Sequence, residues 1–115
     1  MSFDVQLKIL GDYFSLGVDD YPWQIIELPG EAASLEDEAR REISEAHPLF
    51  GVDLTALAEC KMNHEVLFAT DEKCYTIVRL TYQQESDGRY PKFTFFENFG
   101  GALEYIRTQF PFEDF

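Results

Sequence analysis

Apolar residues recur at helical spacing in two segments of the first half of the chain. Over residues 2–16 they return every three or four positions, which predicts a first helix with Gly11 as a candidate end. A second helix is predicted over residues 34–46, because Ser34 precedes Asp37 at the spacing of a capping box. The first half is therefore predicted to be rich in helix.

From residue 52 onward the pattern changes to alternation between apolar and polar positions. The alternation runs over residues 52–62, where nearly all apolar side chains fall at every second position and so on one face of a strand. It returns over residues 66–70 and 74–82. A fourth strand is predicted at 93–96, and Asn98 suits the first position of a closing helix. Short turns join the first three strands, which is typical of antiparallel neighbours.

These elements predict an α+β fold in a single domain over residues 1–115. We expect a four-stranded antiparallel meander with N-terminal helices and a closing C-terminal helix on one face. Residues 25–28 form a candidate for a further brief strand, which Pro29 would end. Hydrophobic residues make up 45% of the chain, enough for a core, so disorder is not expected.

Charge changes the picture most. The chain has 22 Asp and Glu against 9 Lys and Arg, which gives a formal net charge of −13. Such a protein repels nucleic-acid phosphates and anionic lipid headgroups, so direct nucleic-acid and membrane binding are not expected. A basic protein would be attracted and steered toward it. The plainer interpretation is that the acidic residues only keep the protein soluble.

No secretory signal and no apolar run of about 20 residues is evident in the sequence. Asp4 and Lys8 interrupt the only candidate for a signal. We therefore expect a cytoplasmic location, where the two cysteines, Cys60 and Cys74, would stay reduced.

The sequence predicts no metal, no cofactor and no enzymatic activity. Cys60, His64 and Cys74 do not follow a standard zinc spacing, and no motif surrounds either cysteine as a nucleophile. His47 precedes Pro48, and we expect a structural role for it at a helix end. Ligand or catalytic roles for these side chains stay open alternatives.

Acidic side chains provide the candidates for partner binding. Glu38, Glu42 and Glu45 would share one face of the second helix, by the rule that residues three and four apart are neighbours. Trp23 follows two acids and could be an exposed contact, although a tryptophan more often packs in the core. A solvated acidic face is the plain alternative. The predicted contacts are Asp19, Asp20, Trp23, Glu38, Glu42 and Glu45.

Three segments resemble a family of small uncharacterised bacterial proteins with an HPLYG, DDVLF and VVHLTW-like pattern. Here they are HPLFG at 47–51, EVLF at 65–68 and IVRLTY at 77–82, all in the stretch from His47 onward, and the resemblance is taken to cover about half of the chain. The resemblance implies no activity and no catalytic residue. The departures are Phe50 for Tyr, Glu65 for Asp, Arg79 for His and Tyr82 for Trp, and the third weakens any histidine-based site there.

In general character the chain is also similar to the immunity proteins of bacterial toxin systems, which are small, acidic and cytoplasmic. This similarity implies that it binds and neutralises a basic toxin domain, for example a nuclease. The alternative is a small-ligand or regulatory module of a larger assembly, with its site on an open sheet face. An enzyme is the least favoured hypothesis.

Overall fold

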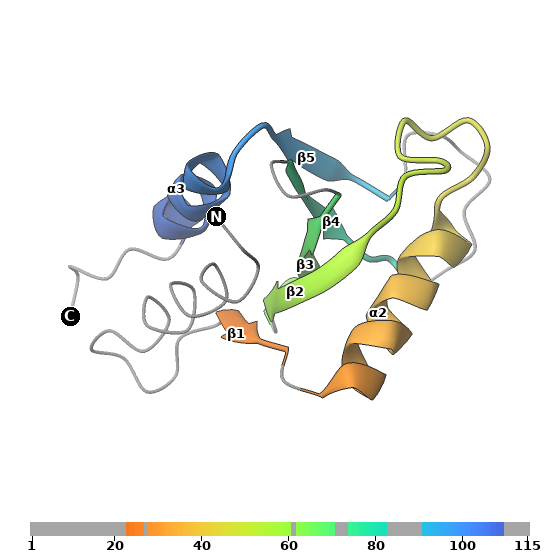
Figure 1. Cartoon of the computed structure of the whole chain (residues 1–115), viewed down its shortest axis with the longest axis horizontal. Helices are drawn as coiled ribbons and strands as arrows, with labels where there is room; N and C mark the ends of the chain where they lie inside the picture. Colours follow the sequence, from red (N-terminus) through yellow and green to blue (C-terminus); the bar gives the residue numbers. More distant parts are fainter. Residues whose placement is uncertain (1–22, 27, 61, 71–73, 83–90, 110–115) are drawn as a thin grey trace.

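A computed structural model describes residues 23–26, 28–60, 62–70, 74–82 and 91–109. Within these residues the chain forms a five-stranded antiparallel sheet and two helices (Figure 1), so the predicted α+β class is confirmed. The helix predicted at residues 2–16 lies outside the described part.

The strands follow one another across the sheet in chain order, and every neighbouring pair is antiparallel, which confirms the meander. The strands are β1 (Trp23–Ile25), β2 (Thr55–Cys60), β3 (Glu65–Ala69), β4 (Tyr75–Arg79) and β5 (Phe93–Phe96). Helix α2 (Pro29–Glu42) lies between β1 and β2, and α3 (Phe99–Gln109) follows β5. Among the described residues, no helix has the length and apolar character that a membrane crossing requires.

The prediction of four strands was wrong, because β1 adds a fifth at the edge beside β2. Trp23 stands opposite Cys60, and Ile25 stands opposite Ala58. A strand of three residues is too short to show alternation in the sequence. It is held because both of its apolar side chains join the same core as their partners on β2.

Helix α2 begins at Pro29 rather than at Ser34. Leu28 is extended and offers no side-chain cap, and proline at the first helical position needs no hydrogen-bond acceptor for its nitrogen. The helix ends at Glu42, before the predicted end at residue 46, because Ile43 returns to an extended conformation with ψ of 110°. Ile43 thereby enters the core under the helix.

The two helices cover opposite faces of the sheet (Figure 1), so the prediction that all helices share one face was wrong. Leu67 and Ile77 pack on the α3 side, whereas Val66 and Val78 pack on the α2 side. Every residue of β3 is buried, because this central strand has a helix layer on each side. Its nearly unbroken apolar sequence is the sign of that arrangement.

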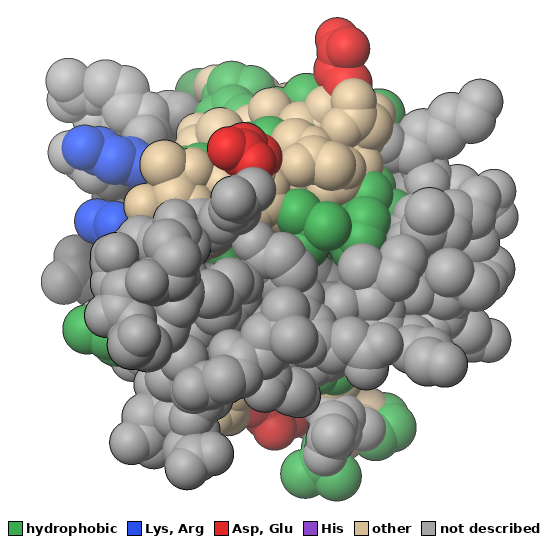
Figure 2. Space-filling model, turned by 90° about the vertical axis from the view of Figure 1, so that its left-hand side faces the viewer, with side chains coloured by type: hydrophobic (Ala, Val, Ile, Leu, Met, Phe, Trp, Pro, Cys, Tyr) green, Lys and Arg blue, Asp and Glu red, His purple; other side chains and the backbone are tan. Residues whose placement is uncertain are grey.

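Some charged side chains of α2 pair within the helix. Arg40 forms an ion pair with Asp37, and Arg41 forms one with Glu38, so these arginines neutralise carboxylates of their own helix. Figure 2 shows the end of the molecule that carries α3, where the described basic side chains lie at one edge and acidic side chains stand apart from them.

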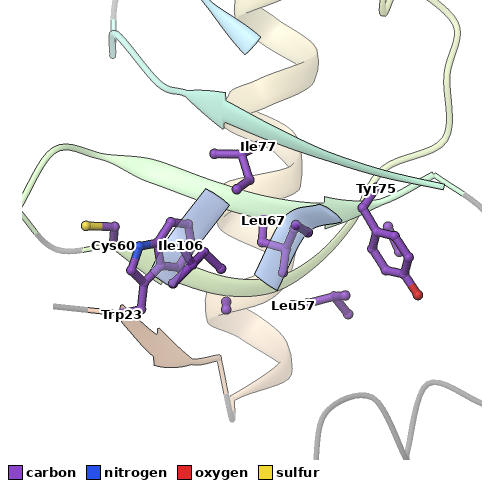
Figure 3. Close-up of a cluster of buried hydrophobic side chains, with 10 residues drawn as sticks. Trp23, Leu57, Cys60, Leu67, Tyr75, Ile77 and Ile106 are labelled. Carbon is purple, nitrogen blue, oxygen red and sulfur yellow. The ribbon is translucent and has the colours of Figure 1, made fainter. Parts of the chain in front are cut away.

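The core on the α3 side is built around Trp23, whose surface is only 1% exposed. Its indole lies with side chains from β2, β3, β4 and α3 (Figure 3). Burying each large apolar side chain contributes about 1.5–3 kcal/mol to stability. The buried members are Trp23, Leu57, Ala58, Cys60, Leu67, Ala69, Tyr75, Ile77, Ala102 and Ile106.

A β-bulge divides β2 between the two faces. The register with β3 shifts between Ala56 and Ala58. Leu54 and Ala56 face the α2 side, whereas Leu57, Ala58 and Cys60 face the α3 side. The predicted single apolar face over the whole strand was therefore wrong, because the extra residue of a bulge reverses the alternation beyond it.

Candidate functional site

Tyr82 stands exposed where the chain leaves β4, in a backbone conformation that is rare for a residue with a side chain. Its φ is 59°, and the φ of His64 is 60°. The Leu80 N–H donates to the carbonyl oxygen of His64 at 3.1 Å. The imidazole ring of His64 and the phenol ring of Tyr82 meet edge to face, with their centroids 5.3 Å apart. Left-handed backbone costs about 1–2 kcal/mol at each such residue, so other contacts must hold them in place.

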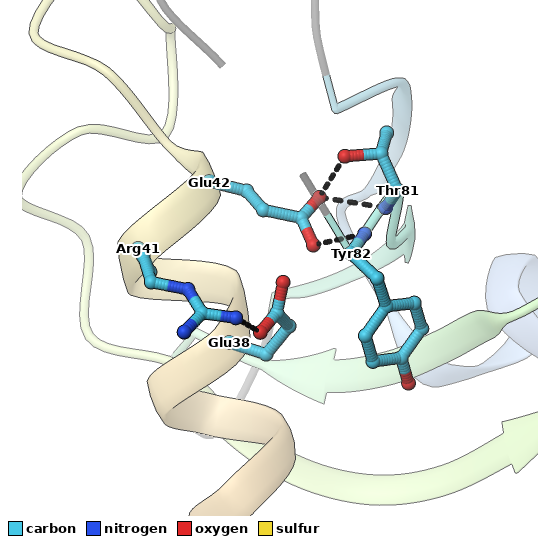
Figure 4. A network of polar contacts seen from close by, with 5 residues as sticks. All are labelled: Glu38, Arg41, Glu42, Thr81 and Tyr82. Carbon is cyan, nitrogen blue, oxygen red and sulfur yellow. Dashed lines mark hydrogen bonds and ion pairs between the residues drawn. The ribbon is translucent and has the colours of Figure 1, made fainter. Parts of the chain in front are cut away.

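Glu42 supplies the main contact. Its Oε1 accepts hydrogen bonds from the Thr81 N–H at 2.7 Å and the Thr81 hydroxyl at 2.9 Å, and its Oε2 accepts one from the Tyr82 N–H at 2.8 Å (Figure 4). The residue is 0% exposed. A carboxylate in the last turn of a helix is disfavoured by the helix dipole, and these donors offset that effect.

Glu38 lies one turn earlier on the same face of α2 (Figure 4). One of its oxygens pairs with Arg41, and among the described residues no donor reaches its buried Oε2. Burial, followed by a hydrogen bond with Glu38, raises the pKa of Glu42, whereas the three donors of Thr81 and Tyr82 lower it. A hydrogen bond between two carboxyl groups needs a proton on one of them, and this accounts for the direction in which Glu38 shifts the pKa of Glu42.

The phenol of Tyr82 is held in a negative field. Its pKa is raised first by burial and then by the nearby charges of Glu59, Glu38 and Glu42. The phenol is therefore neutral at physiological pH, and about half of the Tyr82 surface is exposed within reach of these negative charges. We call Tyr82, His64, Glu38, Glu42 and Glu59 the Tyr82 cluster. An aromatic face among acids attracts a cation.

Comparisons with protein families, curated proteins and solved structures found no match. The resemblance to the family of small bacterial proteins therefore stays a prediction. The three segments that carry it lie in the loop after α2, in β3, and from β4 into the Tyr82 cluster.

The residues predicted to bind a partner are placed differently from one another. Glu38 and Glu42 lie side by side, as their helical spacing predicted, but both are buried. Glu45 is exposed and lies beyond the end of the helix. Trp23 belongs to the core, so its prediction as a surface contact was wrong, because β1 pairs with β2 and brings the indole inward. The remaining two, Asp19 and Asp20, lie outside the described residues.

The exposure of Tyr82 and Met62 was not predicted from the sequence. Tyr82 was assigned to a strand, although it lies beyond β4 with 53% of its surface exposed. Met62 was placed on the apolar parity of β2, yet it is 73% exposed in the turn to β3. The signal that could have found Tyr82 is the polar run that begins immediately after it.

His47 has a structural role, as predicted, but not at the helix carbonyls. The Leu49 N–H donates to its Nδ1 at 3.0 Å, so its Nε2 carries the proton and donates to the Pro91 carbonyl oxygen at 2.8 Å. The buried ring also packs on Phe93, with centroids 5.1 Å apart. His47 thereby ties the loop after α2 to the residues that lead into β5.

Cys60 lies in the core of the α3 side. Cys60 is buried, and burial raises the pKa of its thiol, which disfavours the reactive thiolate. Within the described part of the chain, no three His, Cys, Asp or Glu side chains gather in a way that could hold a metal ion.

Proposed function

We propose that this chain is a binding protein that docks a basic protein partner, with the Tyr82 cluster at the centre of the contact. One observation carries the proposal: a half-exposed tyrosine ring is fixed among three carboxylates. Exposed tyrosines held rigidly are frequent anchors of protein interfaces, because little conformational freedom is lost when they bind.

The chemistry of the cluster indicates what the partner would present. A Lys or Arg side chain placed over the Tyr82 ring gains about 0.5–2 kcal/mol from the cation–π contact. The charges of Glu38 and Glu59 add to the attraction. The net charge of −13 steers a basic partner toward the surface before contact is made.

The more specific form of the proposal is an immunity protein. The partner would then be a basic toxin domain, for example a nuclease, whose active site the acidic chain blocks. The small size and strongly acidic character of the chain support this form. Its distinctive expectation is that the partner alone is toxic to the native host, and that co-expression of this chain prevents the toxicity.

The test begins with purification of the partner from the native host at low salt, followed by measurement of Kd with purified components. Tyr82→Gly removes the ring but keeps the N–H that donates to Glu42, and glycine accepts the left-handed backbone. We expect Kd to rise roughly 30-fold, which corresponds to the loss of about 2 kcal/mol at an interface anchor.

Phe95→Ala is the matched control, because Phe95 is also about half-exposed but lies on the edge strand β5. It should leave Kd within about threefold of the original value. Wild-type Kd should also rise with salt concentration, since acid–base contacts are screened. A Tyr82→Gly variant that binds as well as the wild type, or a Kd independent of salt, would overturn the proposal.

We also keep a second candidate function, a small-ligand or regulatory module. The open sheet face that was predicted for its site is covered, because each face carries a helix. A cavity that favours it instead lies beside α3 and brings together Glu65, Arg79 and Tyr105.

A further inference from the structure

A cavity of about 330 Å³ lies on the α2 side of the sheet, where the helix ends and the chain leads on to β2. Its volume falls within the roughly 300–1,000 Å³ of sites that bind small molecules. The side chains of Ile43, Leu49 and Leu54 line it, and all three belong to the buried core on that side. The cavity therefore offers a largely apolar surface to a ligand.

The loop that forms one wall of this cavity is held in a defined shape. The buried ring of His47 accepts a hydrogen bond from the Leu49 N–H at 3.0 Å. Two turns follow it: the Phe50 N–H donates to the His47 carbonyl oxygen at 3.0 Å, and the Val52 N–H donates to the Leu49 carbonyl oxygen at the same distance. Between them Gly51 has a φ of 82°, which glycine adopts without strain. The wall is thus preformed, so a ligand that binds there loses little free energy to ordering the loop.

The charged residues at the cavity indicate which charge a ligand would carry. Asp53 lines it and is exposed, and its carboxylate has no ion pair or hydrogen bond within the part of the chain that the structure describes. Arg40 also lines the cavity, but its Nη2 forms an ion pair with Asp37 on the same helix. The negative charge of Asp53 is therefore left without a counterion, and the net charge of −13 attracts cations from a distance.

An aromatic ring adds to this preference for a cation. Phe50 lines the same cavity although 55% of its surface is exposed, and the face of such a ring attracts a positive charge. We propose that this cavity binds a small primary amine with an apolar body. Its ammonium group lies beside Asp53 and Phe50, and its apolar body lies on the buried lining. The proposal goes beyond both candidate functions above, because neither of them uses this cavity.

The test is a titration of the isotope-labelled protein at neutral pH, followed through backbone amide signals in NMR spectra. The probe is 2-phenylethylamine, whose ammonium group stays charged at this pH, as that of lysine does. Two analogues keep the ring: 2-phenylethanol has a neutral hydroxyl in place of the ammonium group, and 3-phenylpropanoate has a carboxylate. We expect the amine to cause saturable shifts at the amides of Leu49, Gly51 and Leu54. The alcohol should bind about tenfold more weakly, and the carboxylate should cause no saturable shift there.

Asp53→Asn should weaken binding of the amine about fivefold and leave binding of the alcohol unchanged, because only the amine loses an ion pair. Glu97→Gln is the matched control, since it removes one exposed acidic charge that does not line the cavity, and it should leave the Kd of the amine within about twofold. Phe50→Leu keeps an apolar side chain but removes the aromatic face, and it should weaken binding of the amine about threefold. A response of the amine without one of the alcohol separates recognition of the charge from a change in the fold.

The other outcomes would overturn the proposal in different ways. If the alcohol binds as tightly as the amine at the same amides, or if Asp53→Asn binds the amine as the wild type does, the ammonium group is not recognised by Asp53. If none of the three compounds shifts these amides, the cavity is not a ligand site, and docking at the Tyr82 cluster is unaffected. Saturable shifts by the amine confined to the amides of His64 and Tyr82 would place the cation at the Tyr82 cluster instead of this cavity.

Discussion

Two buried glutamates, Glu42 and Glu65, approach the end of β4 from opposite faces of the sheet. Glu42 reaches Thr81 and Tyr82 from α2, whereas Glu65 faces Arg79 on the α3 side. Their partners differ in kind. Two of the three donors to Glu42 belong to the backbone, whereas the Asn63 amide and the Tyr105 phenol that donate to Glu65 are side-chain groups.

This difference bears on how firmly each carboxylate fixes the chain. Backbone N–H groups cannot turn away, so the Glu42 carboxylate fixes the path of the chain where it leaves β4. Side-chain donors can rotate, so the loss of one of them leaves the backbone near Glu65 in place. The contacts of Glu42 should therefore contribute more to stability than a single contact of Glu65.

The largest expected effect is that of Glu42→Ala. It leaves the N–H groups of Thr81 and Tyr82 without their acceptor and should lower the free energy of unfolding by about 3 kcal/mol. Urea unfolding monitored by circular dichroism measures the change. Glu45→Ala is the control, because this exposed residue should change stability by less than about 0.5 kcal/mol. Equal midpoints for both variants would contradict the role of Glu42.

A smaller effect is expected from pH. Because the folded state raises the pKa of Glu42 above 4.5, its contribution to stability is complete below pH 4.5 and is lost as pH rises through the raised value. Glu38→Gln removes the neighbouring carboxyl group and should make this loss smaller. Urea unfolding midpoints measured from pH 4.5 to neutral test this prediction. Glu97→Gln is the control, because it removes one exposed charge. If the midpoints of the two variants change with pH in the same way, Glu38 does not influence the titration of Glu42.

Tyr105→Phe should lower stability by about 1 kcal/mol, the usual contribution of one hydrogen bond. Burial, followed by the bond to Glu65, raises the pKa of Tyr105 to about 12, so this contribution is present below pH 10 and is lost toward pH 12. Ultraviolet titration of tyrosinate should show a late component near pH 12 that disappears in the variant. The Tyr82→Gly variant should keep the component near pH 12. If the component disappears in that variant, it belongs to Tyr82 and not to Tyr105.

The smallest effect is expected for the exposed pair on α2. Asp37→Ala removes the ion pair with Arg40, in which both side chains are largely exposed, and should change stability by no more than about 0.5 kcal/mol. Calorimetric unfolding at low and high salt measures it. A loss comparable to that of Glu42→Ala would show that the surface charges of α2 hold the fold as strongly as its buried carboxylate does.

Local patterns predicted much of the fold. The strand at 93–96 was predicted with the bounds that the structure shows, and β3 and β4 lie within a residue or a few of their predictions. The predictions that were wrong concern contacts between elements, which the alternation of apolar and polar residues does not encode. The bulge at Leu57 changes the face of β2, and the helix on the second face is revealed only by the apolar residues on both sides of β3.

The candidate site was less accessible to sequence reasoning. Glu38 and Glu42 were found together because residues four apart share a helix face. The buried carboxylate of Glu42 is held by Thr81, which lies 39 positions further along the chain, and no local pattern reports such a contact. Tyr82 was missed for the same reason: its conformation is fixed by Glu42 and His64 and not by its neighbours in sequence.

The order of the strands also has a kinetic consequence. Only a few residues separate β2 from β3 and β3 from β4, so these two hairpins can form with short loop closures. Pairing of β1 with β2 must wait until the chain spanned by α2 has been brought back on itself. The indole of Trp23 on β1 should therefore become buried late, and its fluorescence would report the last step of assembly.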